Sequence, residues 1–282
     1  MFVLQALLMG VVQGLTEFLP VSSSAHIVLT SHMYRFFTGQ ELATVGTNEI
    51  FFDIIIHLGT LFAVMIYLRK EIYLIFKKFV HALKNRDFSS SEAKLPIFIL
   101  LGTFVTCCIV LPLRSVVEGL TSEPSIIGCL LIVTGFILFL SEYISSKYSA
   151  KTNKITLKSA IVMGLVQGLA IFPGISRSGS TIAAGMMCGV DKVSTAKYSF
   201  LLSIPIIVGA SLFFPILELE SFSVVNLSLP ILLTGFLSSM IVGFLCIKYF
   251  MKFLEKCSMK FFAYYCWVVG GCMFLLFGFF IK

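Results

Sequence analysis

The sequence predicts an all-α protein that crosses a membrane several times, and three observations support this. Of its 282 residues, 58% are hydrophobic and only 12% are charged, whereas soluble domains carry about 25% charged residues. Apolar stretches close to the ~20 residues that cross a hydrocarbon layer recur along the chain. Lys and Arg gather in the short segments between these stretches, as the positive-inside rule describes.

Six stretches have the length and composition of transmembrane helices. Each is bounded by polar or charged residues, and the run at 126–141 is the shortest. The predicted spans are 51–68, 95–113, 126–141, 196–217, 229–250 and 262–281.

The basic segments predict the orientation of these spans. Segments 69–94, 142–158 and 248–260 are rich in Lys and Arg, whereas 218–228 has two Glu and neither basic residue. Placing the basic segments in the cytoplasm makes all six spans alternate consistently. The net charge of +7 is therefore explained by orientation, and no nucleic-acid partner is predicted.

Two apolar segments, 1–45 and 159–195, are left over and are interrupted by Pro, Gly and Ser. In the topology above, each begins and ends on the same side of the membrane. Each is predicted to be a re-entrant helix–loop–helix, because irregular backbone survives at membrane depth only inside protein or beside a wet cavity.

The two leftover segments are an internal repeat. MGVVQGLTEFLPVSSSAHIV (9–28) aligns without gaps to MGLVQGLAIFPGISRSGSTI (163–182), with nine of twenty positions identical. Each half of the chain then holds one re-entrant segment and three spans, and an odd number of spans inverts the second half. We expect a single transmembrane domain, 1–282, with inverted repeats at 1–145 and 146–282.

The differences between the copies indicate a divided task. Glu17 and His26 of the first copy have uncharged counterparts in the second, and the counterpart of Ser23 is Arg177. The first copy therefore carries acid–base groups, and the second carries a fixed positive charge. This division suits a site that handles an anion.

Helix geometry brings the polar residues of the first segment together. Gln13 and Glu17 are four apart and share a helix face, and Pro20 then breaks the helix. Ser23 and His26 lie at the start of the next helix, where a hydroxyl is typical. We expect Glu17, Ser23 and His26 to converge as catalytic groups, with Ser23 as candidate nucleophile.

The second segment predicts an anion cradle. A Pro-Gly break at 173–174 is followed by small hydroxylated residues and one Arg. Helix N-termini favour phosphate, and Arg can donate to two phosphate oxygens at once. The predicted phosphate-binding residues are Ser176, Arg177, Ser178, Gly179 and Thr181, with Gln13 from the first segment.

These groups together indicate phosphoryl transfer or hydrolysis, with Arg177 stabilising charge as the bond breaks. A charge deep in a bilayer costs at least ~2.5–3.5 kcal/mol, so such charges are functional by default. Simpler interpretations stay open. Glu17 and Arg177 can form a structural ion pair between the halves, His26 can be a hydrogen-bonded core residue, and Ser22 and Ser24 can simply cap helices.

Asp53 and His57 form another pair four residues apart, at the start of a predicted span. Two placements are equally compatible with the sequence: beside the site as supporting residues, or at the outer membrane interface.

The motifs QGLTEFLPVSSSAH and PGISRSGST, with FDIIIHLGTLFAV at 52–64, resemble those of the undecaprenyl-diphosphate phosphatases, the bacitracin-resistance proteins of bacteria. The resemblance covers essentially the whole chain. It implies hydrolysis of undecaprenyl diphosphate to undecaprenyl phosphate and inorganic phosphate, which recycles the lipid carrier for peptidoglycan. It also implies a multi-pass protein of the bacterial cell membrane, with its site open to the periplasmic or extracellular face.

By this resemblance, Glu17 matches the acidic motif residue, Ser23 the nucleophile, His26 its acid–base partner and Arg177 the phosphate-binding arginine. The family also implies a divalent cation, Mg²⁺ or Ca²⁺, which Glu17 and Gln13 would hold through oxygen atoms. Many members have Glu where this chain has Gln13, which is a weaker metal ligand. Asp53 is the candidate for a second carboxylate.

One other function is compatible with the same features. Inverted repeats with broken helices are typical of transporters, so a flippase for undecaprenyl phosphate is the alternative. A purely structural scaffold does not explain why only the first copy keeps Glu17 and His26. The sequence leaves open whether the chain forms a homodimer.

Overall fold

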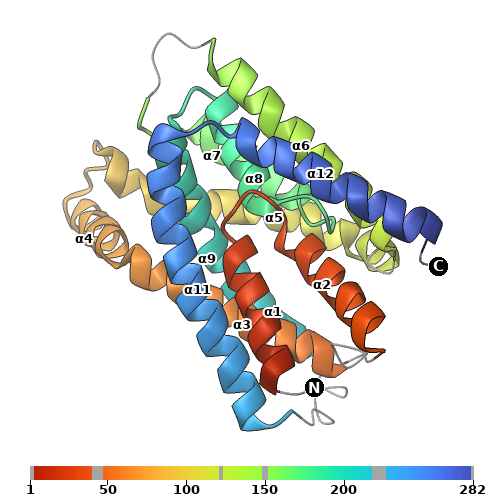
Figure 1. Ribbon diagram of the computed structural model, residues 1–282. Coiled ribbons are helices and arrows are strands. Elements are labelled where there is room, and N and C mark those ends of the chain that lie inside the picture. The colour runs from red at the N-terminus through yellow and green to blue at the C-terminus, as the bar shows by residue number, and fades with distance from the viewer. Residues whose placement is uncertain (1–2, 40–46, 121–122, 148–151, 218–226, 281–282) are drawn as a thin grey trace.

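The computed structural model describes residues 3–39, 47–120, 123–147, 152–217 and 227–280. These residues form helices joined by turns and short coil segments (Figure 1). Within the described ranges no strand forms, and the β-type pairing is an isolated bridge between Thr152 and Val190. The predicted all-α class is therefore confirmed.

Six helices are long and apolar enough to cross a membrane, which confirms the six predicted spans. Some are longer than predicted, because hydropathy marks the hydrocarbon layer while a helix continues into the polar interface. The run at 126–141, for example, belongs to a helix that starts at Pro124, where Pro suits the first turn. The six helices are α3 (Thr47–Tyr67), α5 (Ser91–Leu120), α6 (Pro124–Ser145), α9 (Lys192–Leu217), α11 (Leu229–Lys256) and α12 (Lys260–Leu275), the last continued by a π-helical turn, η1 (Leu276–Phe280).

The two leftover segments each fold as a helix, a turn and a second helix. The first comprises α1 (Val3–Thr16) and α2 (Ser23–Thr38), and the second comprises α7 (Leu157–Leu169) and α8 (Arg177–Met187). These helices have 14, 16, 13 and 11 residues. At 1.5 Å per residue they are shorter than the ~30 Å hydrocarbon layer. The helix–loop–helix form is as expected, and its re-entry into a bilayer stays a prediction.

The first helix of each segment packs on a long helix from the opposite half of the chain. Helix α1 lies along α11, and α7 lies along α5, while α6 and α12 run side by side (Figure 1). Two related halves would produce this reciprocal packing, in which a short helix of each half lies on a long helix of the other. The inversion of the halves and their boundaries at 1–145 and 146–282 remain predictions.

Small residues allow these helices to approach closely. A Cβ atom added at Gly14 of α1 would lie 2.8 Å from the backbone nitrogen of Gly243 and 2.8 Å from the carbonyl oxygen of Ser239, both on α11. At Gly164 of α7, an added Cβ would lie 2.6 Å from the carbonyl oxygen of Gly102 on α5. In lipid, helix association depends on such close packing rather than on the hydrophobic effect.

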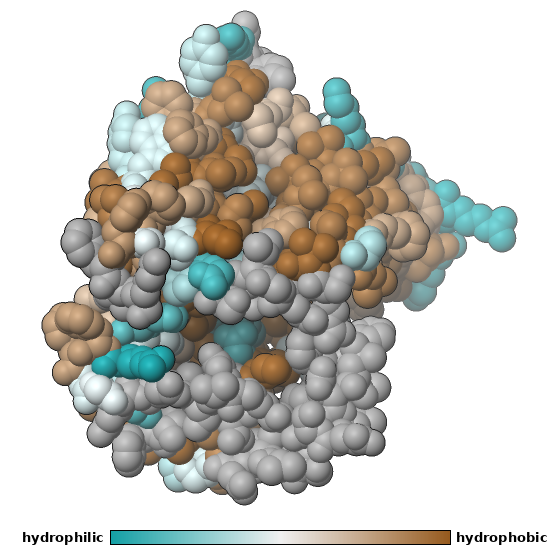
Figure 2. Space-filling view, turned by 90° about the vertical axis from the view of Figure 1, so that its right-hand side faces the viewer, coloured by the Kyte–Doolittle hydropathy of each residue, from teal (hydrophilic) through white to brown (hydrophobic). Residues whose placement is uncertain are grey.

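The outer surface of the bundle is largely apolar. Phe104 of α5, Leu229 of α11 and Val268 of α12 are each about two-thirds exposed, at 65%, 66% and 66%. Figure 2 shows brown, hydrophobic side chains over much of the upper part of one face, with hydrophilic chains projecting at its edge. A surface of this kind is suited to contact with lipid.

Helix α4 (Arg69–Asn85) was not expected, because the sequence identified residues 69–94 only as a basic loop. The segment contains a helical pattern of apolar residues between its Lys and Arg residues, at Ile72, Phe76, Phe79 and Leu83. The sequence prediction considered only the number of Lys and Arg residues in this segment and therefore missed its helical pattern.

We predict that Gly14→Ala lowers the stability of the fold by about 1–3 kcal/mol, as overpacking typically does. The new methyl group would meet backbone atoms of α11, which cannot rotate away. Thermal unfolding of the purified protein in detergent measures the effect. Gly271→Ala is the matched control, because an added Cβ there has nothing within 4 Å. Equal unfolding midpoints for the two variants would contradict the packing described for α1 and α11.

Candidate active site

The turn after α1 and the start of α8 meet near the centre of the molecule (Figure 1). Glu17 lies in the turn that follows α1, and Arg177 is the first residue of α8. The Nη2 group of Arg177 forms an ion pair with Oε1 of Glu17, whose side chain is only 6% exposed. The two polar segments singled out in the sequence are therefore joined through their charged residues.

The second carboxylate oxygen of Glu17 gathers further polar groups. Its Oε2 atom accepts hydrogen bonds from Ser23 Oγ at 2.8 Å and from Gln13 Nε2 at 3.0 Å. The Nε2 atom of His57 lies 3.8 Å from the same oxygen. One buried carboxylate thus links α1, α2, α3 and α8.

The local backbone explains how Ser23 reaches Glu17. The amide of Glu17 donates to the carbonyl of Gln13 at 2.9 Å, so the helical turn continues through Glu17. The chain then reverses at Ser22, whose φ of 65° lies in the left-handed region, and α2 begins at the next residue. Such a conformation costs about 1–3 kcal/mol and is typical of functional sites.

The hydroxyl groups at the start of α8 have partners within the protein. Ser176 caps the helix by accepting from the amide of Gly179 at 3.0 Å, and Ser178 donates to the carbonyl of Leu19 at 2.9 Å. Thr181 is fully buried and lies 2.6 Å from the hydroxyl of Ser199. These side chains hold the helix start in place, and their contact with phosphate stays a prediction.

Glycine at position 179 lets the two segments touch. A Cβ atom there would lie 3.1 Å from Cβ of Pro20, in the turn between α1 and α2. Gly174, with φ +97°, makes the bend before α8 and donates its amide to Ser24 Oγ at 3.4 Å.

Two buried polar atoms of the site lack a hydrogen-bond partner among the described residues: Nη1 of Arg177 and Oε1 of Gln13. Leaving a buried donor of a charged group unsatisfied is costly. One donor edge of Arg177 is therefore unpaired among the described residues while its other edge holds Glu17, and contact of this edge with an anion stays a prediction.

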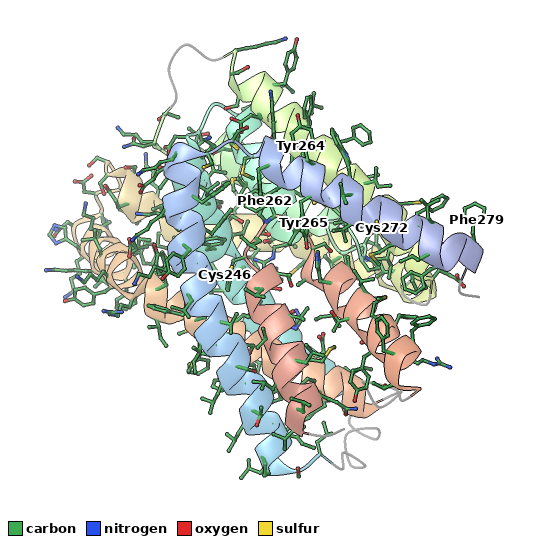
Figure 3. All side chains as sticks on the ribbon, viewed as in Figure 1. Cys246, Phe262, Tyr264, Tyr265, Cys272 and Phe279 are labelled. Atoms are coloured by element: carbon green, nitrogen blue, oxygen red, sulfur yellow. The ribbon has the colours of Figure 1, made fainter. Side chains whose placement is uncertain are left out.

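The expected convergence of His26 with Glu17 and Ser23 is not observed: His26 faces α12, and among the described residues no hydrogen bond joins its side chain to either of them. Its Nδ1 atom lies 2.8 Å from the carbonyl oxygen of Ser22, so in the neutral ring Nδ1 carries the proton. Its Nε2 atom then accepts from the hydroxyl of Tyr265 at 2.8 Å, with the two rings nearly parallel. Figure 3 labels Tyr265 and its neighbour Tyr264 on α12.

Asp53 and His57 are placed beside the site rather than apart from it. His57 Nδ1 bonds the backbone oxygen of Asp53 at 2.8 Å, and its Nε2 faces Glu17. The exposed fraction falls from 48% for the Asp53 side chain to 29% for His57 and 6% for Glu17. These residues thus form a series from a half-exposed to a buried carboxylate.

The implied cation pair, Glu17 and Gln13, does not fit a metal ion in this arrangement. Both oxygens of Glu17 already receive donor groups, and Gln13 presents its amide N–H to the carboxylate. In the described ranges, no group of three His, Cys, Asp or Glu side chains has an arrangement that could hold a metal ion. The cation requirement stays a prediction, and no step below depends on it.

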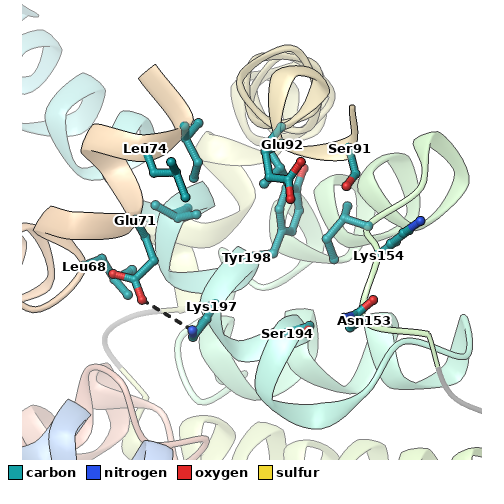
Figure 4. A pocket seen from close by; sticks show the side chains of 14 residues that line it. Leu68, Glu71, Leu74, Ser91, Glu92, Asn153, Lys154, Ser194, Lys197 and Tyr198 are labelled. Atoms are coloured by element: carbon teal, nitrogen blue, oxygen red, sulfur yellow. Dashed lines mark hydrogen bonds and ion pairs between the residues drawn. The ribbon is translucent and has the colours of Figure 1, made fainter. Parts of the chain in front are cut away.

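A cavity of about 270 Å³ lies elsewhere, between α4, the start of α5, residues 153–155 and the start of α9. Its wall includes the ion pair between Lys197 and Glu71 (Figure 4). None of the predicted site residues lines it, so the chemistry is assigned to the Glu17–Arg177 region.

The fold and site define a class: an α-helical membrane protein in which two helix–turn–helix segments join a carboxylate, a hydroxyl and a guanidinium. Residues 6–272 match the family described as bacitracin resistance protein BacA, and the chain belongs to that family.

Similar proteins are named undecaprenyl-diphosphatase. That of Desulforapulum autotrophicum is 40% identical over 276 residues, covering 94% of this chain and 95% of the relative. That of Carboxydothermus hydrogenoformans is 38% identical over 279 residues, 96% of each chain. That of the archaeon Methanosphaera stadtmanae is 36% identical over 278 residues, 95% of each chain.

We predict that Tyr265→Phe destabilises the protein by about 0.5–1.5 kcal/mol, the usual net value of one hydrogen bond. The variant keeps the ring beside His26 but removes the hydroxyl that bonds Nε2. Tyr264→Phe is the control on the same helix, because that ring packs on Phe139 and Trp267 instead. Denaturant unfolding in detergent compares the two. A loss for Tyr264→Phe as large as for Tyr265→Phe would contradict the assigned contact.

Proposed function

We propose that this chain is an integral membrane phosphatase that hydrolyses undecaprenyl diphosphate to undecaprenyl phosphate and inorganic phosphate. The observation that carries the proposal is the shared carboxylate: Glu17 holds Arg177 on one oxygen and the hydroxyl of Ser23 on the other. The family membership and the names of the similar proteins support this substrate.

In the proposed mechanism, the diphosphate head group enters between the two turns and the prenyl tail remains in lipid. The terminal phosphate first meets Nη1 of Arg177, which has no partner in the described chain. When the phosphate also accepts a hydrogen bond from Nη2, Glu17 loses its ion pair with Arg177 and becomes a stronger base. Arg177 thereby both binds the anion and releases the carboxylate.

The freed carboxylate of Glu17 lies 2.8 Å from Ser23 Oγ, within reach of its proton. As Glu17 accepts this proton, Oγ attacks the terminal phosphorus and the bond to the bridging oxygen breaks. Undecaprenyl phosphate departs, and water then hydrolyses the phosphoserine to give inorganic phosphate and Ser23. In the alternative route, which forms no phosphoserine, Ser23 and Glu17 orient a water molecule that attacks the phosphorus in place of Oγ.

The cellular role follows from this reaction. Undecaprenyl phosphate carries cell-wall precursors, so its recycling would serve peptidoglycan synthesis and confer bacitracin resistance. The positive-inside rule places the acidic 218–228 segment outside, and we propose that the site opens to that face of the bacterial cell membrane.

A phosphate-release assay with purified protein in detergent tests the activity. We expect release of inorganic phosphate from undecaprenyl diphosphate, because hydrolysis needs no sealed compartment whereas flipping does. A chelator arm, followed by Mg²⁺ or Ca²⁺, tests the expected cation. Lipid binding without phosphate release would contradict the phosphatase and favour the flippase alternative.

Substitution of Ser23 separates the two routes of attack. If Ser23 is the nucleophile, Ser23→Ala should lower kcat at least about 1,000-fold, as loss of a nucleophile does in other hydrolases. Ser24→Ala is the neighbouring control, because the Ser24 hydroxyl lies beside Ser22 and Gly174 rather than Glu17. If Ser23→Ala retains most of the activity, the nucleophile is water.

A further inference from the structure

Helix α4 is attached to the bundle along one side only. Glu71 pairs with Lys197 of α9 at 3.4 Å, as Figure 4 shows, and Lys78 pairs with Glu92 of α5 at 3.3 Å. Ala82 is buried on the same side. Ile72 and Ile75 pack against the core on this side, whereas Tyr73, Phe76 and Leu83 on the opposite side are exposed.

An apolar stripe runs along the free side of α4. Tyr73, Phe76 and Leu83 are 66%, 65% and 53% exposed. With Val80, they occupy positions three, four and three residues apart, which is one helical face. Two aromatic rings and a leucine at this exposure indicate an apolar environment rather than water.

A basic stripe borders the apolar one. Lys70, Lys77 and Lys84 are all exposed and are seven residues apart, so they align along the helix. The acidic residue of α4, Glu71, points to the opposite side and pairs with Lys197. The free side of the helix is therefore apolar along one edge and positively charged along the next.

The position of α4 indicates what covers this surface. It connects the end of α3 to the start of α5, and both neighbours carry exposed apolar side chains nearby: Ile66 is 41% exposed and Ile97 43%. The apolar stripe of α4 extends this apolar surface, at the end of the spans where the basic segments lie. A surface suited to contact with lipid is thus present beside the helix.

We propose that α4 lies in the membrane interface and binds anionic phospholipid head groups through Lys70, Lys77 and Lys84. Its apolar stripe would enter the boundary between head groups and acyl chains. Juxtamembrane Lys residues attract anionic lipids within a Debye length. The surface is separate from the Glu17–Arg177 site and does not depend on the proposed hydrolysis.

Fluorescence quenching by brominated lipid tests this directly. The chain has one tryptophan, so Phe76→Trp in a Trp267→Phe background places the reporter on α4. The full-length protein is reconstituted in phosphatidylcholine vesicles that contain the same fraction of brominated phosphatidylglycerol or brominated phosphatidylcholine. We expect at least about twofold stronger quenching by brominated phosphatidylglycerol, reduced by salt.

Two controls accompany the reporter. Leu229→Trp in the same background reports from the start of α11, an equally exposed position whose preceding segment lacks Lys and Arg, and should show no preference. Replacing Lys70, Lys77 and Lys84 together by Gln should remove the preference at position 76 while quenching itself persists. Retained thermal unfolding transitions verify that the variants are folded.

Three results would overturn the proposal. Equal quenching by both lipids at position 76 would show no selection for anionic head groups. If the preference for brominated phosphatidylglycerol persists after the triple Gln substitution, Lys70, Lys77 and Lys84 do not bind the anionic head groups. Absence of quenching by either lipid would place α4 in water or beneath another protein chain.

Discussion

The ion pair between Glu17 and Arg177 is the constraint on which the rest of the structure depends. Removing either partner from a buried pair leaves an uncompensated charge, which is strongly destabilising. The two turns must therefore stay together, and the chain supplies the means. Gly179 lets α8 reach Pro20, and the packing of α1 on α11 and of α7 on α5 holds each turn from the opposite half.

In the proposed mechanism, the same ion pair makes the site responsive to an anion. Glu17 is held by Arg177, Ser23 and Gln13, which satisfy a carboxylate that would otherwise be costly in an apolar bundle. In the proposed mechanism, a phosphate replaces the carboxylate on the guanidinium, and the displaced Glu17 then faces Ser23 without its positive partner. Under that proposal, structural pairing and catalysis are two states of one contact, so the two interpretations of the pair are not exclusive.

The sequence predicted the spans and the approach of Ser23 to Glu17, because length, basic segments and helix spacing each leave a local signal. It also predicted that His26 converges with them, and this was wrong. It missed α4, whose apolar face is masked by its lysines, and it placed helix ends by hydropathy rather than by hydrogen bonding. The contact of His26 with Tyr265 was not predictable from spacing, since 239 residues separate them. The ring direction follows from a bond to the carbonyl of Ser22, one turn earlier.

A double-mutant cycle on Glu17→Gln and Arg177→Lys, measured as kcat/KM for phosphate release, tests the central claim most directly. If the two residues act as one unit, the double variant should lose about as much activity as the worse single variant. That outcome corresponds to a coupling of at least about 2 kcal/mol, within the range for contacting residues. Losses that simply add would contradict the account, because they would show that Glu17 and Arg177 contribute independently.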